Sequence, residues 1–405
     1  MKKIIFMLAL GVFIFSTGFS QDESDFIING QGTITDYRGQ ETAVIIPNMI
    51  GGVPVTAIGF SSFSNKGLTS VIIPDGVTFI DARAFYRNQL TSVIIPDSVT
   101  LINSRAFTYN QLTSVIIPDS VTIIRSEAFA YNQITSVIIP SSIKIIEDGI
   151  FNNNKLTSII IPDGVTRIYD NAFSYNQLTS VIIPNSVTSI GRYAFRNNQL
   201  ASVVIPDSVT LISDFVFAAN QLTSVIIPDG VTRIGECAFS NNKLTSLSIP
   251  NNVTFIGKYA FSVNQLTSVV IPDNVTIIES NAFIDNKLVN LIIGSGLTVI
   301  HSECFARNRI TSVIIPGNIT SIYDSAFHEN NLSSVYISDS VTYIGGDAFT
   351  RNPITTVTIG GNVRLGRDMF MGIHYIFDDF YNSNGKKAGT YIFRNSRWSI
   401  VSNDA

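Results

Sequence analysis

Residues 90–111 have the sequence LTSVIIPDSVTLINSRAFTYNQ, and residues 112–133 have the sequence LTSVIIPDSVTIIRSEAFAYNQ. The same period of 22 residues continues without an insertion or deletion from Leu68 to Ile354, through thirteen repeats. A short and regular period is typical of a solenoid, in which each repeat forms one coil and packs only on its neighbours. The sequence therefore predicts one extended stack of coils rather than several globular domains.

The apolar residues of the repeat recur at fixed places. When each repeat is numbered from its leading leucine, position 13 is isoleucine and position 18 is phenylalanine in all thirteen repeats. An identical large ring in every coil predicts a buried column, and ring stacking contributes about 0.5–1.5 kcal/mol per pair beyond area burial. The phenylalanine column includes Phe85, Phe107, Phe129, Phe173 and Phe195.

Position 21 is asparagine in all thirteen repeats. This column is either a ladder that satisfies backbone groups at a tight turn or a polar stripe that recognises a ligand. The apolar columns at positions 18 and 1 lie close to it in sequence, which favours the ladder. The asparagine column includes Asn88, Asn110, Asn132 and Asn176.

The remaining positions indicate short extended segments. Positions 3 to 6, such as residues 92–95, favour a strand, and the proline at position 7 ends it because proline cannot donate to a ladder. Positions 10 to 13 predict a second extended segment, and positions 14 to 20 leave room for one helical or 3₁₀ turn. The predicted fold is a mainly β repeat solenoid, a right-handed coil with a parallel sheet on its concave face and a cap at each end.

The N-terminus has the features of a secretory signal. Lys2 and Lys3 precede an apolar stretch over residues 4–15, and small residues follow it. We expect a signal peptide over residues 1–20 and a mature chain beginning at Gln21, with an uncleaved anchor as the alternative.

The rest of the chain divides into three parts. Residues 21–67 predict an N-terminal cap and an irregular first repeat, and the cap contains a hairpin around Asn29-Gly30. Residues 68–365 form the array of 22-residue repeats. Residues 366–405 carry many aromatic side chains and predict a C-terminal cap, although a separate binding module is an alternative.

Charge and cysteine content restrict the classes of partner. The chain has 26 basic and 30 acidic residues and no basic stripe, so we expect no nucleic-acid partner. No second apolar segment is long enough to cross a membrane in the mature chain. Cys237 and Cys304 lie three coils apart, or roughly 14 Å along the stack, whereas a disulfide requires Cα atoms within about 7 Å. We therefore expect two free thiols.

No motif of catalysis or of cofactor binding is recognisable in the sequence. His301 and His328 occupy different positions of different coils, and His374 follows the array, so we expect solvated side chains. Aspartate is frequent at position 8 and could form a calcium site, but it is also ordinary turn chemistry after proline. We expect no metal, no cofactor and no enzymatic activity.

The pattern LxxVxIPxxVxxIxxxAF, preceded by IGGVPVTAIG at residues 50–59, resembles the BspA-like (Treponema-type) leucine-rich repeats over roughly residues 25–365. The resemblance implies a leucine-rich-repeat fold and an exported or surface protein of a bacterium, associated with adhesion. Many members have cysteine where this chain has the asparagine of position 21, so the resemblance names no particular ligand.

Position 5 is the first candidate for binding. It points away from core positions 4 and 6 by strand alternation, so it faces outward on the sheet. An apolar outward column marks an interaction surface or reflects the preference of β-branched residues for strands. The column consists of Ile72, Ile94, Ile116, Ile138, Ile160, Ile182, Val204 and Ile226, with Ser248 next and Tyr336 further along.

The sequence thus predicts an exported bacterial interaction protein that is found at the cell surface, in the outer envelope or in the medium. We expect a monomer that binds a protein or glycan through the solenoid face. A self-associating structural component of the envelope or matrix is the alternative.

Overall fold

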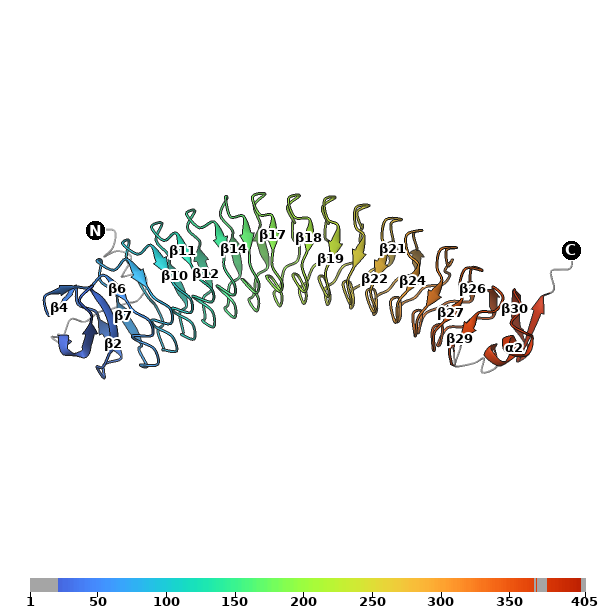
Figure 1. The fold of residues 1–405 in the computed structure, drawn as a ribbon, viewed down its shortest axis with the longest axis horizontal. Helices are drawn as coiled ribbons and strands as arrows, with labels where there is room; N and C mark the ends of the chain where they lie inside the picture. The colour runs from blue at the N-terminus through green and yellow to red at the C-terminus, as the bar shows by residue number, and fades with distance from the viewer. Residues whose placement is uncertain (1–20, 368, 370–376, 402–405) are drawn as a thin grey trace. The chain divides into compact units, whose positions relative to one another are not determined.

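A computed structural model describes residues 21–367, 369 and 377–401 of the chain. The predicted signal peptide over residues 1–20 lies outside this part, as do Phe370, His374 and Tyr375. The chain divides into an N-terminal unit that ends at Pro184 and a C-terminal unit that begins at Asn185. In each unit, short parallel strands lie side by side from coil to coil (Figure 1). The predicted β solenoid is confirmed.

The coils contribute to two columns of short extended segments, most of which are strands. At positions 3 to 5, the coils of Ile94, Val204, Ile226 and Ile314 make only isolated bridges, and the coil of Ser248 forms no strand. In the N-terminal unit, positions 3 to 5 form β3 (Ala43–Ile45), β7 (Ser70–Ile72), β10 (Ser114–Ile116), β12 (Ser136–Ile138), β14 (Ser158–Ile160) and β16 (Ser180–Ile182). Positions 12 and 13 form β6 (Ala57–Ile58), β8 (Phe79–Ile80), β9 (Leu101–Ile102), β11 (Ile123–Ile124), β13 (Ile145–Ile146) and β15 (Arg167–Ile168). These strands pair in parallel and in register, so that Phe79 faces Leu101 and Ile80 faces Ile102.

The C-terminal unit repeats the arrangement. Its position 3 to 5 strands are β21 (Ser268–Val270), β23 (Asn290–Ile292), β26 (Ser334–Tyr336) and β28 (Thr356–Ile359). Its position 12 and 13 strands are β17 (Ser189–Ile190), β18 (Leu211–Ile212), β19 (Arg233–Ile234), β20 (Phe255–Ile256), β22 (Ile277–Ile278), β24 (Val299–Ile300), β25 (Ser321–Ile322), β27 (Tyr343–Ile344) and β29 (Arg364–Leu365).

The phenylalanine column forms the centre of each unit. Phe85, Phe107 and Phe129 are completely buried, and so are Phe195 and Phe217 in the other unit. Neighbouring rings are stacked, with centroids 5.2 Å apart for Phe85 and Phe107 and 5.4 Å apart for Phe107 and Phe129. Close packing of one ring on the next requires a phenylalanine at the same place in every coil.

The turn segment at positions 14 to 20 differs from the helical or 3₁₀ turn that the sequence suggests. Positions 16 and 20 have positive φ in every repeat, for example 57° at Arg83 and 54° at Arg87. The backbone N–H groups of positions 16, 18 and 20 donate to carbonyl groups of the next coil, as Phe85 N does to Ala106 O at 2.8 Å. A helix would use these N–H groups internally, so bonding between coils takes the place of a helix.

Val263 is a β-branched residue at one of these left-handed positions, with φ at 53° and its side chain exposed. This conformation costs an ordinary residue roughly 1–2 kcal/mol, whereas asparagine tolerates it well. We therefore expect Val263→Asn to raise the free energy of unfolding by about 1 kcal/mol, since Asn241 already occupies the same position in the preceding coil.

Urea denaturation measures this effect as a higher midpoint with an unchanged slope. The matched control is Val270→Asn, because Val270 is also an exposed valine but lies in strand β21, where asparagine is disfavoured. Equal changes in stability for both variants would contradict the explanation by backbone strain.

The N-terminal residues extend the stack. A 3₁₀ turn η1 (Glu23–Asp25) precedes β1 (Phe26–Ile28), which pairs antiparallel with β2 (Thr33–Tyr37), so the predicted hairpin is confirmed. Strand β2 pairs in parallel with β6, and the ring of Tyr37 stacks on Phe63 at 5.3 Å, which continues the aromatic column. A second hairpin joins β4 (Met49–Ile50) to β5 (Val53–Pro54) through Gly51 and Gly52, whose positive φ angles favour glycine.

The described C-terminal residues contact the last coil of the array. Helix α2 (Phe377–Ser383) is followed by β30 (Gly389–Arg394) and β31 (Arg397–Val401), and β30 pairs antiparallel with β28. The hydroxyl of buried Tyr381 donates to Gly360 O at 2.7 Å and accepts from Val363 N at 3.1 Å. Tyr391 and Trp398 are buried as well. The described aromatic side chains of this segment therefore pack into the structure, and the capping role of residues 366–405 stays a prediction.

The two cysteines are free thiols, as predicted. Burial is the main cause that raises the pKa of Cys237, to about 11, and it also raises the pKa of the completely buried Cys304. Both thiols are therefore protonated at neutral pH and react slowly. Cys304 occupies position 17, where most repeats have alanine, and it packs as a small apolar residue.

Candidate binding surfaces

The position 5 side chains lie on the surface of the strands. In the N-terminal unit, Ile138 has 84% of its surface exposed, Ile160 68% and Ile94 40%, whereas Ile72 is half-buried. The neighbouring residues at positions 4 and 6 are buried or nearly so, which confirms the predicted outward orientation of position 5. Ile94, Ile116, Ile138, Ile160 and Ile182 therefore make an exposed apolar column.

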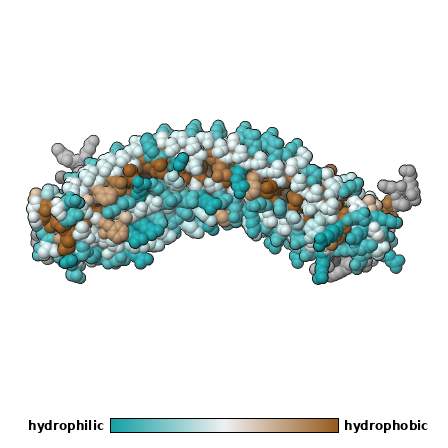
Figure 2. Space-filling model, in the orientation of Figure 1, coloured by the Kyte–Doolittle hydropathy of each residue, from teal (hydrophilic) through white to brown (hydrophobic). Residues whose placement is uncertain are grey.

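The C-terminal unit has a similar but mixed column. Val204, Ile226 and Tyr336 are exposed, and so are Val270, Ile292 and Ile314, while Ser248 interrupts the series with a hydroxyl group. Figure 2 shows apolar residues gathered along the coils between polar ones. Exposed apolar residues that continue from coil to coil are unusual on a soluble protein and favour an interaction surface.

The asparagine column lies inside the stack rather than on its surface. The side-chain amide of Asn132 donates to the carbonyl oxygens of Phe107 and Phe129, and its oxygen accepts from Leu112 N. Asn88, Asn110 and Asn176 make equivalent bonds. Each side chain is buried, so its polar groups are already used by the backbone and are not available to a ligand.

Position 20 carries a set of surface residues that sequence reasoning did not single out. In the N-terminal unit, the rings of Tyr109 and Tyr131 stack with centroids 4.5 Å apart. The guanidinium of Arg87 lies 5.4 Å from the Tyr109 ring centroid, within the range of a cation–π contact. Tyr175 also occupies position 20, and all three tyrosines are exposed. The left-handed backbone at this position turns the side chains away from the buried asparagines beside them.

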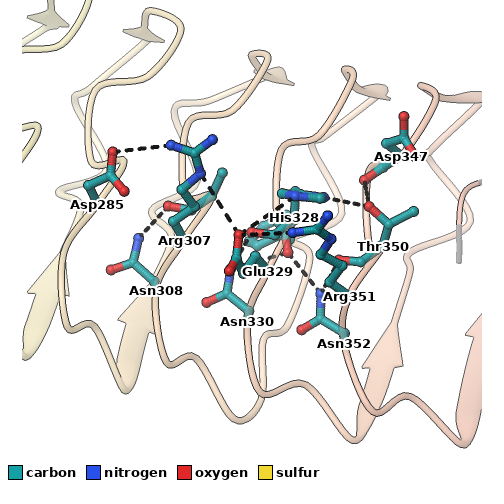
Figure 3. Close-up of polar contacts among 12 residues, drawn as sticks. Asp285, Arg307, Asn308, His328, Glu329, Asn330, Asp347, Thr350, Arg351 and Asn352 are labelled. Atoms are coloured by element: carbon teal, nitrogen blue, oxygen red, sulfur yellow. Dashed lines mark hydrogen bonds and ion pairs between the residues drawn. The ribbon is translucent and has the colours of Figure 1, made fainter. Parts of the chain in front are cut away.

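In the last four repeats of the C-terminal unit, position 20 carries charges of alternating sign. Arg307 lies 3.6 Å from Asp285 and 3.9 Å from Glu329, and Arg351 lies 3.7 Å from Glu329 (Figure 3). These side chains are about half exposed, so each pair contributes at most about 1 kcal/mol. This alternation of charge every 22 residues can be recognised from the sequence without the structure.

One open pocket lies on the turn segments of the N-terminal unit. Its volume is about 330 Å³, and it is lined by Tyr131, Asn132, Gln133, Asn153, Asn154, Lys155 and Tyr175. The tyrosines come from coils on either side of the coil that carries Asn153. Burial is the first cause that raises the pKa of Tyr131, and Tyr109 and Tyr175 add to it, so this phenol stays neutral and can donate a hydrogen bond.

The described residues contain no group of three or more histidine, cysteine or acidic side chains placed to hold a metal ion. His301 lies against Tyr323, and His328 is 2.5 Å from the Thr350 hydroxyl through Nδ1, so the two histidines do not share a site. Among the residues that the structure describes, no helix has the length and apolar character needed to cross a membrane.

Comparisons with known proteins agree with this architecture. A family model described as a BspA type leucine rich repeat region (6 copies) matches residues 56–179, 166–289 and 254–377. A leucine-rich repeat protein from Bacteroides ovatus is 21% identical with a TM-score of 0.53, and the match covers 82% of this chain and 91% of that one. A leucine rich cell surface protein from Faecalibacterium prausnitzii is 27% identical with a TM-score of 0.51, covering 90% and 96%. No curated protein matches the chain.

Repeat solenoids of this kind are scaffolds whose extended surfaces bind other macromolecules. The three segments matched by the family model together span residues 56–377, which is well over half of the chain. The chain therefore belongs to the BspA-type leucine-rich repeat family.

Proposed function

We propose that this protein is an exported, adhesin-like binder of host or bacterial surface macromolecules, and that the position 5 column is its main contact surface. The observation that carries the proposal is the exposure of successive isoleucines, from Ile94 to Ile182, on neighbouring coils. Such a surface is preformed, so a partner can dock without ordering the chain first, and the entropic cost of binding is small.

Two further observations support the surface location. Residues 1–20 have the composition of a secretory signal. The similar structure from Faecalibacterium prausnitzii is described as a cell surface protein.

The experiment is a binding screen against immobilised host matrix and plasma proteins and bacterial surface glycans. The wild type is compared with a variant in which Ile94, Ile116, Ile138 and Ile160 are changed to threonine. Threonine keeps the β-branched shape, and these side chains are exposed, so the variant should fold with nearly wild-type stability. We expect saturable binding by the wild type and a loss of at least about tenfold in affinity for the variant.

The matched control changes Ile123 and Ile145 to threonine. These isoleucines are also exposed, but they lie at position 12 in the other column of strands. Equal loss of binding in both variants would contradict the assignment of the surface.

Light scattering tests the second candidate, a self-associating envelope or matrix component. If the wild type assembles and binds nothing else, while the position 5 variant stays monomeric, the column is a self-association surface.

A further inference from the structure

The tyrosine ladder of the N-terminal unit omits one ring. Tyr86 meets Tyr109 edge to face at 5.6 Å, and Tyr109 stacks on Tyr131 at 4.5 Å. The next coil has Asn153 at position 20, and the coil after it has Tyr175. A shorter polar side chain therefore lies between two exposed rings, in the pocket described above.

The repeat spacing sets the width of this gap. In these three coils the rings of Phe129, Phe151 and Phe173 have centroids 5.8 Å and 6.0 Å apart. Strands of a parallel sheet are about 4.8 Å apart, so the positions of Tyr131 and Tyr175 are separated by roughly 10–12 Å. A single ring midway would lie about 5–6 Å from each tyrosine, which is within the range of aromatic ring contacts. A gap of this width would have room for one ring of a ligand.

Some polar groups of the pocket already make hydrogen bonds within the protein, and others are exposed. Asn132 and Asn154 belong to the buried ladder and bind backbone groups. Gln133 and Lys155 are exposed at position 22 and line the pocket. Asn153 donates to the side-chain oxygen of Asn152, which leaves its own oxygen as an acceptor.

The coil of the gap differs from its neighbours at two positions at once. It has asparagine in place of tyrosine at position 20, and lysine at position 22, where Gln89, Gln111, Gln133 and Gln177 stand in the other coils of the unit. The missing ring and the added cation thus lie in one pocket. Aromatic walls with a few convergent polar groups are typical of small-ligand sites, and a lone exposed ammonium favours an anionic ligand.

We propose that this pocket binds one pyranose residue of an acidic glycan. The sugar ring would lie between Tyr131 and Tyr175 with its C–H faces against the two aromatic rings. Lys155 Nζ would donate to the sugar carboxylate, and Gln133 and Asn153 would bind hydroxyl groups. This site belongs to the turn segments, so it goes beyond the proposed role of the position 5 column and does not depend on it.

Asn153→Tyr is the most informative variant. Tyr131 and Tyr175 occupy the same position with φ at 54°, and Asn153 has φ at 53°, so a tyrosine fits the backbone there. The new ring would complete the ladder and fill the gap. The variant should therefore fold at least as well as the wild type, as circular dichroism and thermal unfolding would show, and yet lose the ligand.

Ligand-observed NMR titration with methyl β-D-glucuronide and methyl β-D-glucoside tests the proposal. We expect the wild type to bind the glucuronide more tightly, and Asn153→Tyr to weaken binding of both sugars at least about tenfold. Lys155→Gln should remove the preference for the glucuronide and leave glucoside binding unchanged. Tyr259→Ala, which removes a tyrosine ring in the C-terminal unit, is the control and should bind both sugars as the wild type does.

Three outcomes would overturn the proposal. The first is the absence of saturable binding of either sugar. The second is equal binding of the sugars by Asn153→Tyr and the wild type. The third is binding of a tyrosine-containing acidic peptide at this pocket when neither sugar binds. The position 5 variant with four threonines separates this site from the proposed function. It should bind the glucuronide normally even if it has lost its macromolecular partner.

Discussion

Replacing Phe129 with alanine will lower the free energy of unfolding by about 3–5 kcal/mol. The Phe129 ring is completely buried and stacks on Phe107 at 5.4 Å and on Phe151 at 5.8 Å, so its removal leaves a cavity bounded by two rings. The backbone N–H of residue 129 still donates to Ile150 O, which prevents the coils from closing over the space.

Urea denaturation followed by circular dichroism measures the loss. Because each coil packs only on its neighbours, we also expect the transition to broaden or to split into two steps. Hydrogen exchange should accelerate in the coils of Phe107 and Phe151 more than near Phe305. Phe79→Ala is the control. Phe79 lies at position 12 of its repeat, in strand β8, and is only half-buried, so a loss of about 1 kcal/mol is expected. Equal losses for the two variants would contradict a special role of the ring column.

Much of this fold follows from residues that never change between repeats. Ile80 and Phe85 and their equivalents marked the core, because a buried column tolerates only one shape per coil. The turn segment was predicted less well. The residue types around Arg83 and Arg87 are compatible with a helical turn. They do not indicate that the backbone N–H groups donate to the next coil rather than within their own.

One of the two candidate sites could be predicted from the sequence, and the other could not. The outward orientation of Ile138 followed from alternation along a strand, which is a local rule. The gap between Tyr131 and Tyr175 could not be recognised, because it depends on rings that stack across coils and on one coil where the ring is missing. Variation at position 20 beside constant positions 18 and 21 was the signal in the sequence, and variation is what a binding surface requires.

Changing Asn132 to aspartate will destabilise the protein in a pH-dependent way. The amide of Asn132 donates to three carbonyl oxygens, those of Phe107, Phe129 and Ala130, at 3.0 to 3.1 Å. A carboxylate cannot donate, and it would bring negative charge to three carbonyl oxygens inside the stack. Burial and these oxygens would raise the pKa of the introduced carboxyl group, by about 3 units for a fully buried site.

The sign of the pH effect follows from that shift. The unfolded chain ionises this group near pH 3.9, while the folded chain keeps it neutral to a higher pH. The destabilisation is therefore smallest below about pH 4, and it grows by about 1.4 kcal/mol for each pH unit until the raised pKa is passed. Near pH 7 it exceeds the destabilisation in acid by roughly 4 kcal/mol. A loss of about 1–3 kcal/mol remains in acid, because the protonated acid has one O–H in place of two N–H donors.

Urea titrations of wild type and variant at pH 3.5, 5 and 7 measure this dependence as a difference at each pH. Asn251→Asp is the control, because Asn251 is exposed at position 8, where other repeats carry aspartate, and its effect should not vary with pH. A pH-independent loss for Asn132→Asp would mean that the side chain only fills space. The bonds to the backbone instead require the amide, since only a neutral group that donates and accepts at once can link Phe107 O to Leu112 N in a buried turn. That requirement applies equally in every coil, and it explains why position 21 never varies while the surface residue beside it does.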